Sequence, residues 1–563
     1  MRLRRHLPLI VALLLCAPAL FLDYYNDDWL VRWVLQGNAP GSDPHPLRLY
    51  EFMGSEAQVR GYIREGMLPW WSDPRLKIRF LRPLSSLLMW ADHRVLQTPL
   101  LGHLHSLLWF VAFLIVARRV IDRVLPPRGA RWAFWTLCLA GYHAGTVLWI
   151  AARNGLSAAT ISLVALYTHL DDRLSDRPVR SLRVAALFAL SLMFAETALG
   201  LVPMLLAVEA LAVRRPLADR VRALAPTVSF TAVYLVAYAA LGYGVAGTGG
   251  YIDPLREPVH FLRVMPARWM TLVAEALVGV ISEITLVLPG AMAVTGTLGA
   301  VALALVTYAL HRTRDDRPHR YVEALAVGSL LALVPTLGGM LGGRLLALAG
   351  VGAALVMGAL ADSALRRGKR WLLAPLAVVM ALGVLSRLGA GATQLKASRE
   401  ERSIGQRPVT ACPIDADRAL IEGADPGVAI AGAIAASEWP GYRGRFRVLS
   451  TEPVAHVVTR VSAQTLALTP VTGALATSFA AEVYRHRALP FREGEVVDTT
   501  DARFVVRDVV DGRPRRVEVT FARSFEGRAT CLLRWRGGRL EPFDPPPIGA
   551  SVTLPHEPGP FGM

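Results

Sequence analysis

Long apolar runs alternate with short polar gaps along the first 390 residues of the chain. Runs of roughly 17–25 apolar residues, folded as helices, are long enough to cross the hydrocarbon core of a membrane. The pattern therefore predicts a polytopic α-helical membrane protein with about eleven spans. We place these spans near residues 6–22, 99–117, 132–152, 155–170, 182–197, 199–213, 224–246, 287–310, 322–338, 343–361 and 371–389.

The charged gaps between the runs predict an orientation. Gaps rich in arginine fall on one side of the membrane if the N-terminus is inside: "RLRR", "ARRVIDRVLPPRGAR", "DDRLSDRPVRSLR", "RRPLADRVR", "HRTRDDRPHR" and "RRGKR". Because cytoplasmic loops are enriched in Arg and Lys, we expect a cytoplasmic N-terminus and an external C-terminus. Residues 262–284 are also apolar but carry charges, so we expect an amphipathic helix in the outer interface. The alternative, a true span, would reverse the topology after it.

Two hydrophilic regions should then face outward. The first is a long loop at residues 23–98, in which residues 46–66 show helical spacing of their apolar positions. The second is residues 391–563, in which "RFVVRDVVDGRPRRVEVTF" surrounds Asp511-Gly512, a strong hairpin signal. A similar arrangement surrounds Gly537-Gly538, and residues 423–439 are typical of a short helix. We therefore predict a transmembrane bundle at 1–390 and a small, mostly β external domain at 391–563.

Composition agrees with a membrane protein, since 53% of the residues are hydrophobic and only 19% are charged. The net charge of +17 does not indicate a nucleic-acid partner, because the arginines lie in the gaps between apolar runs. Abundant Arg, Ala and Leu with few Lys are typical of a GC-rich bacterial genome, so we expect a bacterial inner membrane and a periplasmic C-terminal domain. In that oxidising compartment Cys412 and Cys531 can pair; the alternative is two buried free thiols.

An acidic cluster stands where the first apolar run ends, in "FLDYYNDDWL". Asp27 and Asp28 have three interpretations: they solvate a helix end, bind a divalent cation, or act as general bases on a hydroxyl. Further along, "RFLRPLSSLLMWADHRVL" and "HLHSLLW" supply groups that can hold a phosphate by charge-assisted hydrogen bonds. The alternatives for these groups are binding of lipid headgroups and helix packing. They are Arg82, His93, His103 and His105.

Together these stretches resemble the first-loop region of the family C glycosyltransferases, in particular the protein O-mannosyltransferase-like branch. The shared pattern is an acidic pair after the first helix, "RPL" entering a helix, and a His ahead of the next span. "FAETALGLVPMLLAVEAL" resembles a hairpin of that family, with Glu196 and Pro203 in register and Ala195 where Lys is usual. "VPTLGGMLGGRLLALAG" resembles its late external loop, in which an Arg, here Arg344, precedes a span.

The resemblance, over roughly residues 6–390, implies transfer of a sugar from a polyprenyl-phosphate donor to an acceptor on the outer face of the membrane. It implies that Asp27 or Asp28 is the base and that cations hold the donor phosphate. It leaves open the sugar, the acceptor and any divalent cation, since the superfamily contains metal-dependent and metal-independent members. The implied phosphate-binding residues are Arg82, His103, His105, Arg153 and Arg344, with Glu196 and His93 in support.

Two further interpretations of the sequence remain. A lipid or saccharide transporter would place polar groups near the midplane of broken helices, whereas the notable acids and bases here lie toward the outer ends. A non-catalytic membrane scaffold would display the C-terminal domain to a partner, but it would leave the arrangement of the loop residues unexplained.

Overall fold

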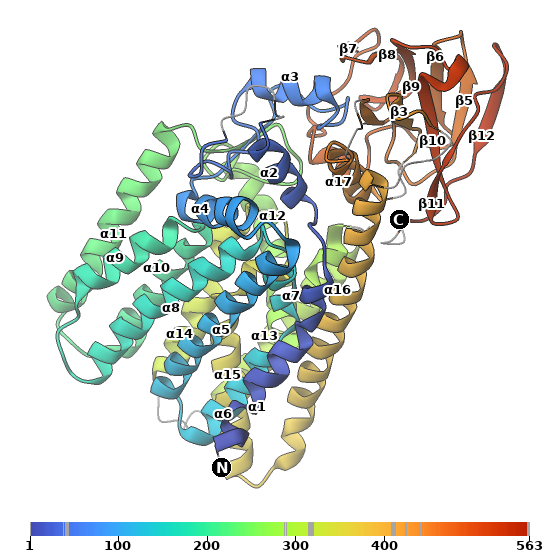
Figure 1. Cartoon of the computed structure of the whole chain (residues 1–563). Helices are drawn as coiled ribbons and strands as arrows, with labels where there is room; N and C mark the ends of the chain where they lie inside the picture. The colour runs from blue at the N-terminus through green and yellow to red at the C-terminus, as the bar shows by residue number, and fades with distance from the viewer. Residues whose placement is uncertain are drawn as a thin grey trace.

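Helices account for most of the chain up to residue 406, and strands for most of the remainder (Figure 1). The computed structural model describes residues 2–37, 39, 44–286, 288, 290–313, 320–406, 412–422, 425–439, 442 and 444–559. The principal helices of the bundle are α1 (Arg2–Leu15), α5 (Pro99–Val124), α6 (Pro127–Leu139), α8 (Arg153–Leu174), α9 (Ser181–Leu192), α10 (Leu201–Ala207), α11 (Leu217–Ala240), α12 (Pro258–Val278), α13 (Ala291–Arg312), α14 (Arg320–Ala332), α15 (Gly350–Arg366) and α16 (Ala374–Gln406).

Four stretches of the described chain are single helices long and apolar enough to cross a membrane: α5, α11, α13 and Arg370–Ile404, which contains most of α16. Other apolar runs are divided among shorter helices. The run at 132–152 becomes α6, η3 (Gly141–His143) and α7 (Ala144–Val147), and the run at 199–213 becomes α10 and η5 (Val208–Ala212). The count of about eleven spans therefore stays a prediction.

Residues 262–284 lie in α12 and the short η6 (Ser282–Leu286). Helix α12 packs along α13 so closely that a Cβ on Gly299 would lie 1.9 Å from the carbonyl oxygen of Met270. Arg268 is buried and donates to the carbonyl oxygens of Leu337 and Gly339, at 2.8 and 2.9 Å. This segment thus packs against α13 and against the chain after α14. Its depth in a membrane stays a prediction.

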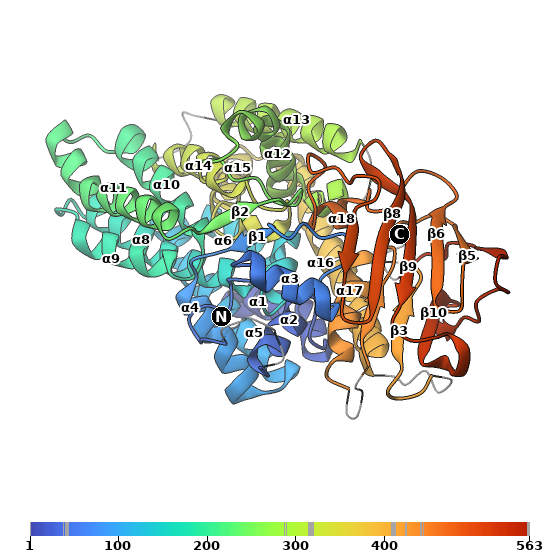
Figure 2. The same cartoon turned by 90° about the horizontal axis from the view of Figure 1, so that it is seen from above.

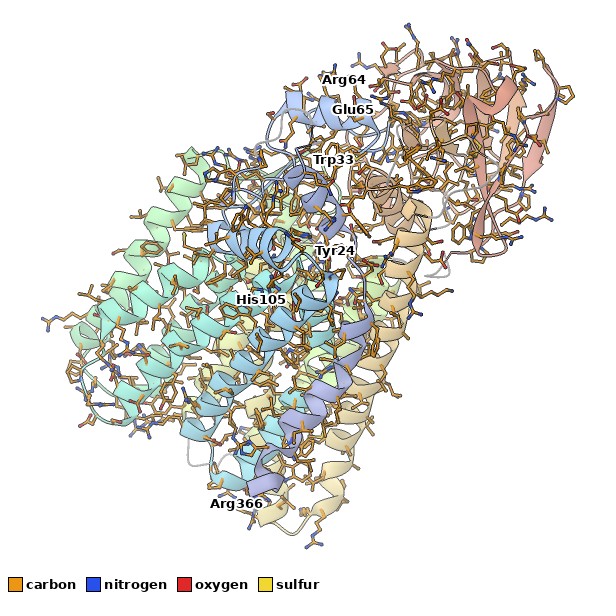
Figure 3. The ribbon with its side chains drawn as sticks, viewed as in Figure 1. Tyr24, Trp33, Arg64, Glu65, His105 and Arg366 are labelled. Atoms are coloured by element: carbon orange, nitrogen blue, oxygen red, sulfur yellow. A yellow bond between two sulfur atoms is a disulfide. The ribbon has the colours of Figure 1, made fainter. Side chains whose placement is uncertain are left out.

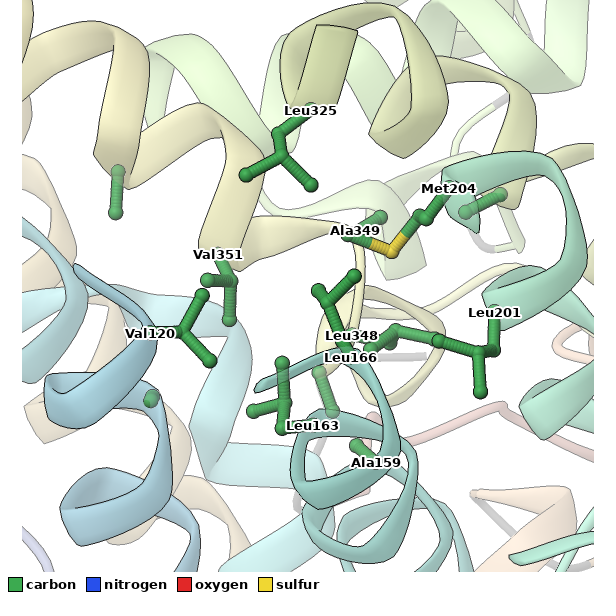
Figure 4. Packing of buried hydrophobic residues seen from close by; sticks show 14 of the residues in the cluster. Val120, Ala159, Leu163, Leu166, Leu201, Met204, Leu325, Leu348, Ala349 and Val351 are labelled. Carbon is green, nitrogen blue, oxygen red and sulfur yellow. The ribbon is translucent and has the colours of Figure 1, made fainter. Parts of the chain in front are cut away.

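The core of the bundle is made by apolar side chains from helices far apart in the sequence (Figure 4). Leu163 and Leu166 of α8 lie among Met204 of α10, Leu325 of α14 and Val351 of α15. All five are fully buried. Arg64 and Glu65 of the first loop lie at one end of the bundle, and Arg366 lies at the opposite end (Figure 3). The N-terminus is at the same end as Arg366 (Figure 1).

The long first loop folds into short elements that cover the other end of the bundle. Of residues 46–66, whose spacing predicted a helix, only 56–65 form one, and Ser55 caps its N-terminus by accepting from the Gln58 N–H; residues 46–55 are not helical, and Met53 pairs with Ile78 as an isolated β-bridge. The strand of this loop pairs with β2 (Gly244–Ala246), which follows α11. The elements are α2 (Asp27–Leu35), α3 (Glu56–Glu65), β1 (Lys77–Arg79), α4 (Pro83–Ala91) and the π-helical η2 (Asp92–Leu96).

The C-terminal region contains two sheets. A six-stranded antiparallel sheet has the order β12-β5-β6-β9-β8-β7, and a four-stranded sheet has the order β11-β10-β3-β4 with β3 parallel to both neighbours. The strands are β3 (Asp417–Leu420), β4 (Phe446–Val448), β5 (His456–Arg460), β6 (Thr465–Pro470), β7 (Val496–Asp498), β8 (Ala502–Val510), β9 (Arg513–Phe521), β10 (Thr530–Arg536), β11 (Arg539–Pro542) and β12 (Ser551–Leu554). Two helices accompany them, α17 (Pro426–Ala436) and α18 (Phe479–Glu482).

Both predicted hairpins are present. Asp511 and Gly512 join β8 to β9 with φ of 50° and 74°, and Gly537 and Gly538 join β10 to β11 with φ of 57° and 75°. Two successive positive φ values match the right-handed twist of the strands, which is why Asp-Gly and Gly-Gly favour such turns. A disulfide links Cys412 to Cys531 of β10. Helix α16 runs without a break across residue 390 and carries the chain into this region.

The C-terminal region packs on the first loop (Figure 2). Trp70 stacks on Phe504 with ring centroids 5.0 Å apart and donates from its indole to the carbonyl oxygen of Leu449. The buried Arg447 pairs with Asp501 and donates to the carbonyl oxygen of Ile63 at 2.9 Å. These contacts hold the end of α3, and with it the first loop, against the C-terminal sheets.

Candidate functional site

The acidic cluster lies at the turn where the chain leaves η1 (Ala17–Phe21) and enters α2. Asn26 precedes the helix with φ 51° and ψ −115°, a backbone conformation that is costly for a residue with a side chain. Asp28 is fully buried, and each of its oxygens accepts a backbone N–H, one from Ala151 at 2.9 Å and one from Tyr25 at 3.1 Å. Asp28 therefore ties the start of α2 to the segment before α8.

A cavity of about 560 Å³ opens beside this turn, between the first loop and the bundle. Four residues expected at the site line it together: Asp27, Arg82, Glu196 and Arg344. Aromatic side chains form much of the wall, among them Tyr50, Phe80, Trp149, Tyr234, Tyr238 and Tyr251. The first loop, the start of η4 (Glu196–Gly200), α11, the segment after β2 and the segment before α15 thus meet at one place.

Arg82 stands directly before α4, and Pro83 occupies the first position of the helix, where its missing N–H costs nothing. The Arg82 Nε donates to Glu196 Oε2 at 2.7 Å, and the Arg82 guanidinium lies 4.2 Å from the ring centroid of Phe80. Tyr238 donates to the other oxygen of Glu196 at 3.4 Å. Glu196 therefore fixes the orientation of the Arg82 guanidinium.

Arg344 lies in the short η9 (Gly343–Leu346), with its guanidinium 5.5 Å from the ring centroid of Trp149. Its Nη2 is 3.5 Å from the carbonyl oxygen of Met340, and it forms no ion pair with a carboxylate among the described residues. Arg344 is thus a cation at the cavity wall whose charge is not cancelled by direct contact with an acid.

Asp27 is half-buried and faces the cavity. Its carboxylate makes no hydrogen bond or ion pair with any part of the chain that the structure describes. Burial raises the pKa of Asp27 to about 6, while the charges of Arg344 and Arg82 oppose that rise. A carboxylate that titrates slightly below neutral pH, next to a cavity, has the properties of a general base.

The remaining basic residues expected at the site do not line this cavity. Arg153 is buried, pairs with Asp92, and donates to the Gly102 carbonyl oxygen at 3.1 Å. His105 Nδ1 lies 2.8 Å from the other oxygen of Asp92. This cluster joins η2 of the first loop to α5 and α8.

His103 and His93 are also buried outside the cavity. His103 Nε2 lies 3.4 Å from the carbonyl oxygen of Asp23, and the His93 ring lies 5.0 Å from the ring of Tyr24. Burial lowers the pKa of His93 to about 4, so its ring is neutral at physiological pH. Among the residues that the structure describes, no group of three or more His, Cys, Asp or Glu side chains is arranged to hold a metal ion.

Two residues of this neighbourhood were not predicted from the sequence. Asp92 stands within "MWADHRVL", and a single acid among basic residues is the signal that could have identified it. Glu401 of α16 accepts a hydrogen bond from the Asn26 N–H across 375 positions of sequence. No local pattern connects those two positions.

No family model matches the chain, and no curated protein matches it. Among solved structures, it is similar to the Archaeoglobus fulgidus oligosaccharyltransferase AglB in complex with an inhibitory peptide and a dolichol-phosphate, at 11% identity and a TM-score of 0.39 over 80% of this chain and 65% of that one. It is also similar to ArnT from Cupriavidus metallidurans bound to undecaprenyl phosphate, at 13% identity and a TM-score of 0.31 over 78% and 89%. The chain thus spans less than two thirds of the archaeal enzyme. At these identities and TM-scores the similarity assigns neither a family nor a reaction to this chain.

Proposed function

We propose that this chain is a membrane-bound glycosyltransferase that moves a sugar from a polyprenyl-phosphate donor to a hydroxyl acceptor on the outer face of the membrane. One observation carries the proposal: the carboxylate of Asp27, which pairs with no described residue, faces the same cavity as two guanidinium groups, among aromatic and apolar walls. The resemblance of the first loop to family C glycosyltransferases points the same way.

Arg82 and Arg344 are suited to hold the phosphate of the donor. A phosphate leaving group gains negative charge as the sugar departs, and fixed cations aimed at it lower the barrier. Guanidinium groups bind phosphate oxygens in a fork geometry, and the Arg82 fork is already oriented by Glu196. The two arginines therefore stabilise the released polyprenyl phosphate.

The polyprenyl chain has an apolar exit from the cavity. Leu199, Val202 and Leu235 line one wall. Leu235 belongs to α11, whose Val233 and Val236 are exposed on the outside of the bundle. An isoprenoid tail can therefore extend from the cavity along α11 into the surrounding lipid.

The chemistry follows from these positions. The acceptor hydroxyl oxygen attacks the anomeric carbon of the sugar while Asp27 takes the hydroxyl proton. The bond between the anomeric carbon and the phosphate oxygen breaks, and the electron pair stays on the polyprenyl phosphate beside Arg82 and Arg344. Asp27 then releases its proton to water. In this scheme the N-terminus is cytoplasmic, and the cavity and C-terminal domain face the periplasm of a bacterial inner membrane.

The test is transfer from radiolabelled polyprenyl-phosphate sugars in membranes that contain the full chain. Asp27→Asn should abolish transfer, because the amide cannot take the proton. Glu56→Gln is the matched control, since Glu56 is an exposed acid of the same loop that pairs with Arg60. Undiminished transfer by Asp27→Asn would contradict the proposal. Absence of transfer by the wild type from every polyprenyl donor would favour the non-catalytic scaffold instead.

A further inference from the structure

The turn that carries Asp27 needs support from outside itself. Its N-cap residue, Asn26, has the strained backbone described above and makes no side-chain capping hydrogen bond, although Asn is a favoured capping residue. A conformation of this kind persists only where the surroundings impose it. Asp27 is the next residue, so whatever holds Asn26 also sets where the Asp27 carboxylate points.

Glu401 supplies that support from α16. Its Oε2 accepts the Asn26 N–H at 2.9 Å and the Trp29 indole N–H at 3.1 Å. Glu401 is fully buried, and Trp29 is nearly so. The first N–H groups of a helix lack partners within it, and a side-chain oxygen of Glu401 can accept from such a group whether or not the acid is ionised. Glu401 thus acts on α2 as a capping acid supplied by a distant helix.

The incomplete hydrogen bonding of Glu401 argues that a contribution to stability is not its whole role. Its other oxygen, Oε1, is buried and finds no hydrogen-bond partner in the described part of the chain. A buried acid that is only partly satisfied is a poor contributor to stability, and an apolar side chain of similar size often serves a core better. The presence of an acid here is explained by the Asn26 turn that it holds, directly before Asp27.

The neighbouring residue provides an internal contrast. Arg402 pairs with Asp23 at 2.5 Å, three residues ahead of Asn26. Its side chain is 56% exposed, so the pair is screened by solvent and contributes little. Helix α16 runs the length of the bundle up to the C-terminal domain (Figure 1) and reaches the 23–29 segment through both Glu401 and Arg402; of these two residues, Glu401 is the one that accepts from the strained Asn26.

From this geometry we propose that Glu401 is a positioning residue for the transfer reaction: its carboxylate holds the Asn26 turn and so keeps the Asp27 carboxylate in the cavity. The inference rests on the proposed function, because Asp27 is the base only in that scheme. Glu401 does not touch the substrates. Its removal should lower kcat and leave the KM for the donor nearly unchanged, since Arg82 and Arg344 stay in place.

The experiment compares Glu401→Leu with Glu401→Gln in the purified full chain. Leu removes the acceptor, and misplacement of Asp27 by about 1 Å should reduce kcat by roughly 100-fold. Gln keeps a carbonyl oxygen at the same position and should restore most of the activity. Arg402→Gln is the control and should transfer at the wild-type rate. Wild-type kcat in Glu401→Leu, or equal losses in Leu and Gln, would overturn the inference.

Two additions keep the result decisive. If Glu401→Leu does not fold, Trp29→Phe removes the indole N–H together with one ring of a buried side chain, and it should still lower kcat without changing the donor KM; an unchanged kcat there counts against the inference. Backbone hydrogen exchange of residues 24–30 needs no activity, and it should speed up in Glu401→Leu and stay unchanged in Glu401→Gln. If wild-type transfer is absent but exchange responds in this way, the proposed function fails and the positioning of the turn stands. If transfer is present but neither exchange nor kcat responds, the positioning fails alone.

Discussion

Replacing Arg344 by Gln should move the pH dependence of sugar transfer to higher pH. A general base must be ionised to act, so the rate in the wild type should rise as the pH passes through about 6, the pKa of Asp27, and level off above it. Burial keeps that pKa high, and of the two guanidinium groups that lower it, Arg344 has the larger effect. Removing the Arg344 guanidinium takes away one of the two effects that lower the pKa of Asp27, so this pKa rises.

The size of the shift follows from the change in charge. Loss of one nearby opposite charge shifts a carboxyl pKa by about one unit. At pH 7 the ionised fraction of Asp27 would then fall from about nine tenths to about one half, a loss of roughly twofold. Well below pH 6 the same shift lowers the ionised fraction by about tenfold. The effect is therefore small at neutral pH and large in mild acid.

The assay is kcat/KM for transfer measured between about pH 5 and about pH 9, with each variant normalised to its own plateau. Normalisation is needed because Arg344 also binds the donor phosphate in the proposed scheme and its loss lowers the plateau. Arg60→Gln, which removes an exposed arginine paired with Glu56, is the control and should leave the midpoint unchanged. A midpoint in Arg344→Gln that stays at the wild-type pH or moves lower would refute the assignment of Asp27 as the titrating base.

Three further outcomes are expected. Glu196→Gln should lower kcat/KM for the donor by about tenfold, because the Arg82 guanidinium loses the charged partner that orients it; steady-state kinetics measures this. Arg447→Ala should destabilise the docked C-terminal region by about 3–5 kcal/mol, because Asp501 is left buried and unpaired; limited proteolysis and thermal melts of purified protein measure this. Reducing the disulfide of the C-terminal region, which closes 119 positions of sequence, should cost about 5 kcal/mol and lower the melting temperature of that region; a melt with and without reductant decides it.

Local chemistry in the sequence was enough to predict the elements that depend on neighbouring residues. The apolar face of α3 lies within one stretch of chain, and its Val59, Tyr62 and Ile63 are buried as the spacing indicated; the capping Ser55 was not predicted. The two hairpins depend on Asp-Gly and Gly-Gly at the turns, which set the pairing of the residues beside them; farther from its turn, the β8–β9 pair shifts register between Val506 and Val509. The parallel pairing of β3 with β10 was not predicted, because it joins segments more than a hundred residues apart with no turn between them.

The residues of the candidate site were predicted together, but in the structure some of them line the cavity and others are buried away from it. Asp27 and Asp28 are adjacent on α2, so they point to different faces of the helix, and the sequence gives no reason to prefer either. Packing turns Asp28 onto the Ala151 N–H and leaves Asp27 at the cavity. Arg82 and Arg153 were both predicted to bind the donor phosphate, but Arg153 is buried in an ion pair with Asp92 and does not line the cavity. Such divisions depend on which helices meet, and no local pattern encodes that.

The contacts of the C-terminal region bear on how its role can be tested. Gly249 donates to the carbonyl oxygen of Glu482 at 2.7 Å, and His486 donates to that of Gly247 at 2.9 Å. The segment they hold continues into Tyr251, which lines the cavity. Deletion of residues 395–563 would therefore remove Glu401 and loosen a cavity wall at once, and a loss of transfer in that deletion would not show that the region selects the acceptor. Acceptor selection has to be tested with surface variants of the two C-terminal sheets that leave these backbone contacts and Glu401 in place.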